Sequence, residues 1–310
     1  MEIKKIVVAG AGTMGASMAQ IFARYGYEVT LYNHRQKTLD KATGKISDNV
    51  KTLVETKALT DAEAESLLAA LSYTVDLNCF QDCDLVVENL TEVLAVKEAF
   101  YTQISELVRP DTIVATNTSG LSINKLGASV KDPSRFLGMH WFNPPHLVPL
   151  IEIIKGDTTT DEAAQTIYDL SLSVGKKPVI VQKDVPGFAG NRLQFAVLRE
   201  ALDMVEKGII SPEGIDDVMK YGLGFRYACL GPLEVADFGG LDTFYHISEY
   251  LMKDLCDSKE PPALLKEHFE NQEFGVKNEK GFYDYSDGKA AEATQKRDEA
   301  FLKLFHALYD

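Results

Sequence analysis

The chain has 310 residues, and its 32 basic against 46 acidic side chains leave a formal net charge of −14 at pH 7. This balance argues against a nucleic acid or an anionic membrane as the main partner, because binding to phosphate groups on such surfaces needs a surplus of Lys and Arg. A hydrophobic share of 45% and a charged share of 25% are typical of a globular protein, and the length suggests about two domains.

Short apolar runs alternate with longer helical patterns over the first 185 residues. We expect strands at residues 3–9, 28–32, 85–88, 112–116, 136–140, 151–154 and 178–181. The stretch 38–71 predicts two helices, and capping-box spacing at Thr60 and Glu63, and again at Thr159 and Glu162, marks two helix starts. This alternation predicts an α/β fold in which helices cover both faces of a parallel sheet.

Strand signals largely stop after residue 185. Apolar residues occupy every fourth position from Leu193 to Val205, which predicts a helix that ends at Gly208. Ser211 and Pro212 have the order of a helix cap and a first helical residue. We therefore expect two domains, a dinucleotide-binding α/β domain at 1–185 and a helical domain at 186–310.

A glycine-rich turn follows the first expected strand. Gly10, Gly12, Thr13, Met14 and Gly15 form the pattern G-x-G-x-x-G, and a helical pattern follows at once. In dinucleotide-binding folds the first glycine permits a tight turn, the second admits a pyrophosphate, and the third lets helix and strand pack closely. The N–H groups at the helix start then face the phosphates. In this context the pattern predicts a dinucleotide site, with a turn that binds no ligand as the alternative.

The end of the second expected strand carries Asn33, followed by His34 and Arg35. A carboxylate at this point would hydrogen-bond the adenosine ribose and repel a 2′-phosphate. Asn33 can still bond the ribose hydroxyl without bringing a negative charge. NADP is therefore left open beside NAD as the cofactor, because Asn33 replaces the usual Asp and Arg35 is adjacent. A solvated surface position is the alternative for Arg35.

His140 lies at the end of an apolar strand, where ligands bind in open α/β sheets. Twelve residues later Glu152 stands within the apolar run 150–154, and a carboxylate in such surroundings needs a partner. A histidine held by a carboxylate can take the proton of a substrate hydroxyl while hydride leaves for a nicotinamide. From spacing alone, a structural histidine with Glu152 on an exposed edge is the slightly favoured interpretation.

Several motifs in collinear order resemble the L-3-hydroxyacyl-CoA dehydrogenase family over nearly the whole chain. They are the glycine turn, Asn117-Thr-Ser119, the block 138–145 around His140, Glu152, the segment 186–192, Gly231-Pro-Leu-Glu234 and Lys280-Gly-Phe-Tyr283. The resemblance implies a Rossmann-type doubly wound sheet followed by an all-helical C-terminal domain through which the protein forms a homodimer. It also implies oxidation of a secondary alcohol to a ketone with NAD, here the 3-hydroxyl of a short-chain 3-hydroxyacyl-CoA.

The same resemblance implies roles for individual residues. His140 would be the general base, Glu152 would orient it, and Ser119 and Asn191 would hydrogen-bond the reacting oxygen. The implied cofactor contacts, besides the glycine turn and Asn33, are Glu92, Lys97, Asn117, Ser119, Asn143 and Lys277. Solvent-exposed charge is the alternative for Glu92, Lys97 and Lys277.

Two other functions remain open at this point. The segments 143–149, 191–194 and 222–227 look closer to relatives that oxidise CoA-free hydroxy compounds of the gulonate, carnitine or hydroxylated aromatic carboxylate type. Consistent with this, the stretch 48–57 offers CoA phosphates only Lys51 and Lys57, offset by Asp48 and Glu55. The other alternative is a non-enzymatic structural protein like a lens crystallin, which the intact glycine turn and the His140–Glu152 pair disfavour.

Four cysteines are too few for a disulfide scaffold, and Cys79 with Cys83 lacks a second pair for a zinc site. We therefore expect a cytoplasmic protein without a metal site. No apolar run reaches the length of about 18 residues that spans a bilayer. The expected partner of the protein is a small-molecule substrate, with no nucleic acid and no membrane.

Overall fold

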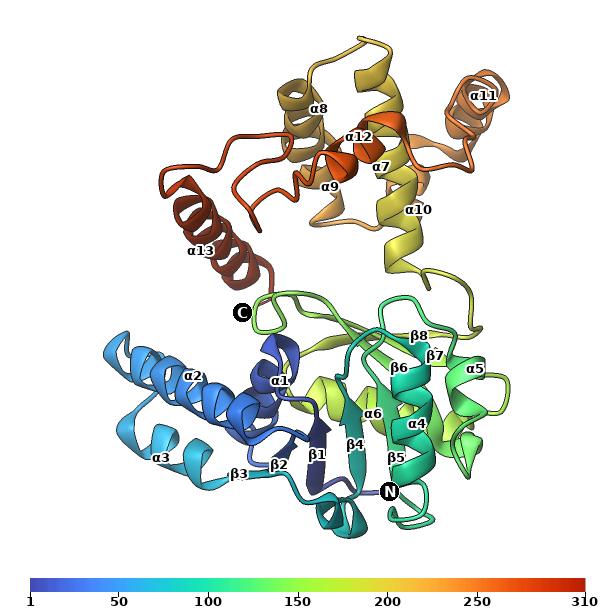
Figure 1. The fold of residues 1–310 in the computed structure, drawn as a ribbon. Coiled ribbons are helices and arrows are strands. Elements are labelled where there is room, and N and C mark those ends of the chain that lie inside the picture. The colour runs from blue at the N-terminus through green and yellow to red at the C-terminus, as the bar shows by residue number, and fades with distance from the viewer. Residues whose placement is uncertain (310) are drawn as a thin grey trace. The chain divides into compact units, whose positions relative to one another are not determined.

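The computed structural model describes residues 1–309, and the chain divides into two compact units. The first unit is Met1–Gly190 and the second begins at Asn191. Figure 1 shows the sheet in the first unit and helices joined by loops in the second. This is the expected class of fold, a doubly wound α/β sheet followed by a helical region.

The first unit is built on one sheet of eight strands in the order β3-β2-β1-β4-β5-β6-β7-β8. The strands are β1 (Lys5–Ala9), β2 (Glu28–Tyr32), β3 (Leu71–Thr74), β4 (Leu85–Glu88), β5 (Ile113–Thr116), β6 (Phe136–Trp141), β7 (Leu150–Lys155) and β8 (Lys177–Val181). Every neighbouring pair is parallel except β6 and β7, which are antiparallel. The register of that pair places His140 opposite Glu152.

Helices cover the sheet on both faces. They are α1 (Thr13–Arg24), α2 (Gln36–Glu55), α3 (Asp61–Ala69), η1 (Leu77–Asp82), α4 (Leu94–Ile104), α5 (Ile123–Gly127), η2 (Pro133–Arg135) and α6 (Asp161–Ser173). Successive strand residues point to opposite faces, so Ile6 and Val8 of β1 join one hydrophobic cluster while Val7 and Ala9 join another. Burial on both faces explains why the strands are apolar runs and not alternating patterns.

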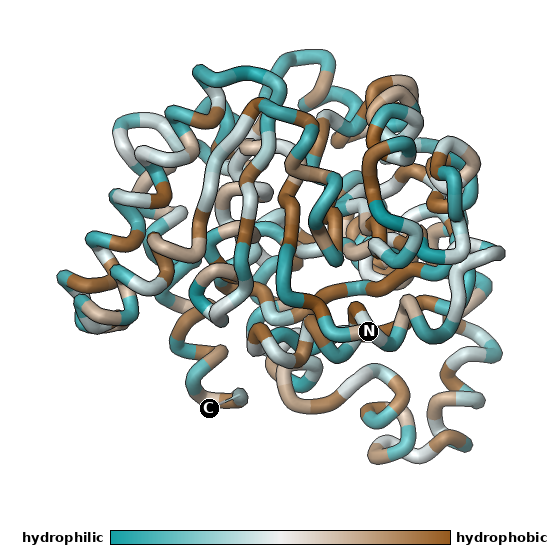
Figure 2. Tube along the Cα trace, turned by 90° about the horizontal axis from the view of Figure 1, so that it is seen from below, coloured by the Kyte–Doolittle hydropathy of each residue, from teal (hydrophilic) through white to brown (hydrophobic). Residues whose placement is uncertain are grey.

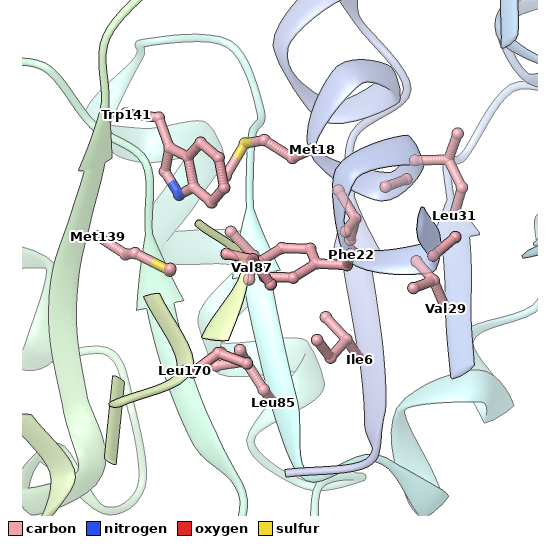
Figure 3. Packing of buried hydrophobic residues seen from close by; sticks show 14 of the residues in the cluster. Ile6, Met18, Phe22, Val29, Leu31, Leu85, Val87, Met139, Trp141 and Leu170 are labelled. Atoms are coloured by element: carbon pink, nitrogen blue, oxygen red, sulfur yellow. The ribbon is translucent and has the colours of Figure 1, made fainter. Parts of the chain in front are cut away.

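The larger cluster packs α1 against the centre of the sheet. Figure 3 shows the ring of Phe22 beside the strands that carry Ile6 and Val87, with Met18 and Trp141 nearby. The rings of Phe22 and Trp141 meet edge to face, with centroids 5.6 Å apart. In Figure 2 brown and teal alternate along the helices at the rim of the view, as expected of helices with one apolar stripe.

Two local expectations need correction. The strand β3 lies at 71–74, where only the end of a helical stretch was expected, because Leu71 pairs with Val29 of β2 at the sheet edge. The cap of α6 is Thr160 and not Thr159, since Thr160 accepts from the N–H of Ala163. The hydroxyl of Thr159 instead donates to the carbonyl of Phe136. The capping box of Thr60 and Glu63 is confirmed.

The second unit is helical among its described residues. Its helices are α7 (Gly190–Glu206, which begins at the last residue of the first unit), α8 (Pro212–Val218), η3 (Met219–Leu223), α9 (Gly224–Tyr227), α10 (Pro232–Gly239), α11 (Leu241–Leu251), α12 (Ala263–Glu270) and α13 (Lys289–Tyr309). Ser211 caps α8 as expected. Leu202 is the one hydrophobic side chain that counts as buried within the described part of this unit. Apolar side chains such as Leu233 and Phe238 of α10 are more than 80% exposed.

In the region 1–309 no helix is both long and apolar enough to cross a membrane. The same residues contain no group of three or more His, Cys, Asp or Glu side chains placed to hold a metal ion.

Candidate active site

The order of the strands creates a crevice in the first unit. The chain runs outward from β1 to β2 and β3, and then resumes on the other side of β1 with β4. In open α/β sheets, ligands bind beyond the carboxyl ends of the strands at such a switch point. The glycine turn after β1, Asn33 after β2, Asn89 and Glu92 after β4, and Ser119 after β5 therefore share one edge of the sheet.

Close contacts require two of the three glycines of the turn, Gly10 and Gly15. A Cβ on Gly10, whose φ is +108°, would lie 2.6 Å from the carbonyl oxygen of Asn89. A Cβ on Gly15 would lie 1.8 Å from the carbonyl oxygen of Gly10. At Gly12 nothing lies within 4 Å of that position. The backbone is therefore tightly packed at Gly10 and Gly15 and open at Gly12.

The open position fits a dinucleotide. Gly12 leaves room for a phosphate beside the backbone, and α1 begins immediately afterwards with Thr13 and Met14. The first turn of α1 contains no acidic residue, so no negative side chain offsets the positive end of the helix dipole there. The observed turn thus has the space and the donors that a pyrophosphate needs.

Asn33 is buried beside this turn. Its Oδ1 accepts from the N–H of Ala11 at 3.3 Å, and its Nδ2 donates to the carbonyl of Arg35 at 3.2 Å. The N–H of Ala11 needs an acceptor and the Arg35 carbonyl needs a donor, which assigns the orientation of the amide. Asn33 thereby joins the glycine turn to the start of α2.

His140 and Glu152 form a buried pair across β6 and β7. The Nδ1 of His140 lies 2.9 Å from Oε2 of Glu152, and the two side chains are 7% and 1% exposed. The rings of Phe142 and Phe188 pack against the imidazole at centroid distances of 4.6 and 5.8 Å. Glu152 therefore lies on a buried strand and has His140 as its partner. This excludes the exposed edge position that spacing alone left open.

The backbone completes the surroundings of Glu152. Its Oε1 accepts from the N–H groups of Ala189 and Gly190 at 2.9 and 2.8 Å. Burial raises the pKa of Glu152, but the hydrogen bonds from His140, Gly190 and Ala189 outweigh burial and lower the pKa below its ordinary value. An ionised Glu152 takes the Nδ1–H of the imidazole and leaves Nε2 with a lone pair that can accept a proton.

Asn117 and Ser119 follow β5. Asn117 donates to Oδ1 of Asn89 at 2.7 Å and accepts from the N–H of Trp141 at 2.8 Å, so it links the ends of β4, β5 and β6. Glu92 accepts from the N–H of Ser119 at 2.9 Å and from its hydroxyl at 3.4 Å. The hydroxyl of Thr118 also donates to Glu92.

Lys97 has a different position from the one expected of a cofactor contact. Its side chain is 1% exposed, and its Nζ lies 2.6 Å from Oε1 of Glu88 and 3.4 Å from Oε2 of Glu92. The ammonium group of Lys97 lies inside the protein because it pairs with the buried carboxylate of Glu88. Lys97 also contacts Glu92, which accepts from Ser119, so Lys97 is connected to Ser119 through Glu92. Two further hydroxyls, of Tyr101 and Thr116, donate to Glu88 at 2.5 and 2.8 Å.

The residues around Glu88 were missed by sequence reasoning. The signal was present, since Glu88 ends the otherwise apolar strand Leu85–Glu88 and such a carboxylate needs buried partners. Lys176 was also missed. It is buried, donates to the carbonyls of Pro145 and Val148 at 2.5 and 2.9 Å, and holds the loop that contains Asn143. Its Nζ lies 5.3 Å from the ring centroid of Trp141.

Two candidate residues belong to the second unit. Asn191 is in the first turn of α7. Lys277 is exposed and lies on a loop that lines a cavity of about 870 Å³ with Phe269, Phe274 and Phe282. In the first unit, the structure brings together His140 with Glu152, Asn89 with Asn117, and Glu92 with Ser119 and Lys97.

Comparisons with known proteins identify relatives that match most of both units. The model of the 3-hydroxyacyl-CoA dehydrogenase NAD-binding domain matches residues 5–185, and the model of the C-terminal domain of that enzyme matches residues 187–285. The 5-formyl-3-hydroxy-2-methylpyridine 4-carboxylate 5-dehydrogenase of Mesorhizobium japonicum is 38% identical over 95% of this chain and 96% of that protein. The 3-hydroxybutyryl-CoA dehydrogenase of Clostridioides difficile is 36% identical over 91% and 99%.

Solved structures give the same two groups of relatives. A 5-formyl-3-hydroxy-2-methylpyridine 4-carboxylic acid 5-dehydrogenase, described as an NAD+-dependent dismutase, superposes with a TM-score of 0.89 at 35% identity and covers 98% of this chain and 97% of that chain. The (S)-3-hydroxybutyryl-CoA dehydrogenase of Ralstonia eutropha superposes with a TM-score of 0.78 at 34% identity and covers 92% and 100%.

Proposed function

Since the chain belongs to the 3-hydroxyacyl-CoA dehydrogenase family, we propose that it oxidises the 3-hydroxyl of a short-chain 3-hydroxyacyl-CoA to the ketone. The family confirms the expected class of enzyme, an NAD-dependent dehydrogenase that acts on a secondary hydroxyl, and NAD as its cofactor. One observation carries the chemistry. The buried His140–Glu152 pair, at 2.9 Å, supplies a base whose orientation is fixed by its contact with the carboxylate of Glu152.

In this proposal His140 is the general base. Its Nε2 takes the proton of the substrate hydroxyl, and the ionised Glu152 stabilises the imidazolium that forms. The bound nicotinamide supplies the acceptor for the hydride. Ser119 and Asn191 donate hydrogen bonds to the reacting oxygen, which in the reverse direction stabilises the developing alkoxide. The aromatic rings of Phe142 and Phe188 keep water from the imidazole.

We assign most of the cofactor contacts to the crevice of the first unit and one to Lys277 of the second unit. The glycine turn formed by Gly10, Gly12, Thr13, Met14 and Gly15 faces the pyrophosphate. Asn33 faces the adenosine ribose. The remaining contacts in the proposal are Glu92, Asn117, Ser119, Asn143 and Lys277, with Lys97 acting through Glu92.

A CoA-free hydroxy compound is the second candidate substrate. The match to the hydroxypyridine carboxylate enzyme includes nearly the whole chain at the higher of the two TM-scores given above. In addition, Lys51 of α2, one of two lysines in the stretch where CoA phosphates are expected, lies 3.9 Å from Glu55. A cation that is paired with a carboxylate attracts a phosphate less strongly.

A panel of alcohols distinguishes the two substrates. Purified protein and NAD are mixed with 3-hydroxybutyryl-CoA, gulonate, carnitine or an aromatic hydroxy carboxylate, and the absorbance of the reduced nicotinamide is followed. Turnover of the thioester at a kcat/KM at least about tenfold above the others supports the first proposal. Turnover of an acid without CoA, in the absence of thioester activity, selects the second candidate. If no alcohol is oxidised with NAD or NADP, both proposals fail.

We also propose that the protein is a homodimer formed through the second unit. The support is the exposure of apolar side chains on helices that bury little of their own surface, including Phe225, Leu233, Phe238 and Tyr245, which are 62–82% exposed. Large apolar side chains left exposed in such number favour a protein interface. We place the enzyme in the cytoplasm, on its low cysteine content alone.

A further inference from the structure

We propose that the end of β2 accepts the 2′-phosphate of NADP, so that this enzyme uses NADP in addition to NAD. The subsite consists of Asn33, Arg35 and the first turn of α2. The inference rests on the dinucleotide crevice of the first unit and not on the identity of the alcohol.

The first reason is the chemistry of Asn33. The residue at this point in dinucleotide-binding folds meets the hydroxyls of the adenosine ribose, and a carboxylate there repels a phosphate. Asn33 is neutral and 6% exposed. Its Oδ1 is occupied by the N–H of Ala11, and one hydrogen of its Nδ2 is occupied by the carbonyl of Arg35. The second hydrogen of Nδ2 has no acceptor among residues 1–309 and can donate to a ligand.

The second reason is the positive charge next to Asn33. Arg35 is exposed, and its guanidinium has no ion pair within the described part of the chain. A guanidinium binds a phosphate through two parallel hydrogen bonds. The hydrogen bond from Asn33 to the Arg35 carbonyl fixes the backbone from which this side chain extends. Arg35 thus starts from a fixed point at the rim of the ribose site.

The third reason is the helix that follows. Arg35 is the cap of α2, a helix of 20 residues whose first turn contains no acidic residue and includes Lys37. The N-terminal N–H groups and the helix dipole both favour an anion there. Together, the helix end and Arg35 offer a dianion two independent sources of stabilisation.

Among residues 1–309, the carboxylates on adjacent elements make no ion pair with Arg35. Asp40 lies one turn into α2 and accepts from the side chain of Gln36 at 2.8 Å. Asp76 follows β3, whose Thr74 carbonyl accepts from the N–H of Asn33, and it caps η1 by accepting from the N–H of Asn78 at 2.9 Å. Each is an acceptor within its own element.

The test compares two ligands that differ only in the 2′-phosphate, namely adenosine 2′,5′-bisphosphate and 5′-AMP. Their Kd values are measured by calorimetry on the full chain without any alcohol. We expect the wild type to bind the bisphosphate at least as tightly as 5′-AMP. Arg35→Ala should weaken binding of the bisphosphate by about tenfold or more, as the loss of a charged hydrogen bond predicts, and leave the Kd of 5′-AMP within about twofold. Asn33→Asp should raise the ratio of the bisphosphate Kd to the 5′-AMP Kd by about tenfold or more, because its carboxylate repels the 2′-phosphate and still accepts from the ribose hydroxyl.

Lys45→Ala is the matched control, because it removes an exposed cation from the same helix nearly three turns further on. It should leave the ratio of the two Kd values unchanged. Circular dichroism of each variant verifies that it is folded. The proposal is overturned if the wild type binds the bisphosphate more than about tenfold less tightly than 5′-AMP, or if neither variant changes the ratio.

Kinetics separate this proposal from the proposed function. With an alcohol that the enzyme oxidises, the ratio of kcat/KM for NADP to that for NAD should fall by about tenfold or more in Asn33→Asp. An unchanged ratio contradicts the subsite while leaving the dehydrogenase function intact. Binding of the bisphosphate without turnover of any alcohol has the opposite meaning, since it supports the subsite and counts against the proposed reaction.

Discussion

At the residue scale, the reactivity of His140 depends on the hydrogen bonds that hold the carboxylate of Glu152 in place. One carboxylate oxygen faces the imidazole and the other accepts from two consecutive backbone N–H groups, so Glu152 cannot rotate without losing several hydrogen bonds. Those bonds lower the pKa of Glu152 and keep it ionised at neutral pH. The base is therefore oriented before any substrate binds, which reduces the cost of reaching the transition state.

Replacement of the base tests this assignment. In His140→Gln, the amide can still donate to Glu152 but cannot accept the proton, so we expect kcat to fall by about a thousandfold or more. The Kd of NADH, measured by fluorescence, should change by less than about threefold, because the glycine turn is untouched. His246→Gln is the control, since that histidine is 74% exposed on α11. Turnover near the wild-type rate in His140→Gln would remove His140 from the base role.

At the element scale, a buried ion pair joins α4 to the end of β4. Glu88 accepts from Lys97, Tyr101 and Thr116 and from the N–H of Leu90. Because Lys97 also lies 3.4 Å from Glu92, this cluster holds the carboxylate that receives the N–H of Ser119. The packing of α4 on the sheet thus determines the position of a loop in the crevice.

A double-mutant cycle measures this coupling. Lys97→Met leaves Glu88 buried without its cation, and we expect it to lower the free energy of unfolding by about 3–5 kcal/mol. Adding Glu88→Gln removes the uncompensated charge and should recover a large part of that loss. Urea unfolding of the wild type, both single variants and the double variant gives the coupling energy. Additive effects of the two substitutions would contradict the coupling.

Also at the element scale, Lys176 holds the loop 143–149. Because its pKa is shifted, its effect on the stability of the fold depends on pH. Burial lowers the pKa of Lys176 from 10.5 to about 8. Between about pH 8 and 10.5 the folded protein has released this proton while the unfolded chain still binds it, so stability rises with pH in this window. At lower pH, a buried charge with two carbonyl acceptors opposes folding more than an ordinary lysine does.

The comparison with Lys176→Met isolates this residue from all other titrating groups. We expect the free energy of unfolding of the wild type, minus that of the variant, to increase from pH 8 to pH 10, as measured by urea titration at each pH. Lys183→Met removes an exposed lysine from the same unit and serves as the control. A wild-type advantage that falls as the pH rises would show that the ammonium form is the stabilising one.

At the scale of the whole molecule, the two units differ in how they bury apolar surface. The first unit has two large clusters, one on each face of its sheet. The second unit exposes Leu233 and Phe238 of α10 at 81% and 82%. A helical unit that hides so little apolar surface needs another surface to cover it. This contrast supports the proposal that two copies of the chain associate through the second unit.

A single charge on this surface tests the proposed dimer. Phe238→Glu places a carboxylate where an apolar contact is expected, so we expect the variant to be a monomer at micromolar concentration. Light scattering after size exclusion gives the mass of each species. Asn271→Asp adds the same charge at the end of α12 and should remain dimeric. A monomeric wild type would disprove the dimer outright.

Sequence alone determined the features that depend on neighbouring residues. The apolar runs predicted seven of the strands, and the glycine turn after β1, the capping box at Thr60 and the cap at Ser211 all lie where the patterns indicate. These signals are local, because a turn, a cap or a period needs only residues a few positions apart. The His140–Glu152 pair could be predicted only because both residues lie at strand positions with unusual neighbours.

Only the tertiary structure decided which distant groups meet. The edge strand β3 is defined by its pairing with β2, and Lys97 turns toward Glu88 because the packing of α4 excludes water from both. The contacts of Asn117 with Asn89 and Trp141 and of Lys176 with the loop 143–149 join segments 24 to 31 residues apart. Such contacts leave no periodic trace in the sequence, since they arise from burial, which forces each polar group to find a partner wherever the fold supplies one.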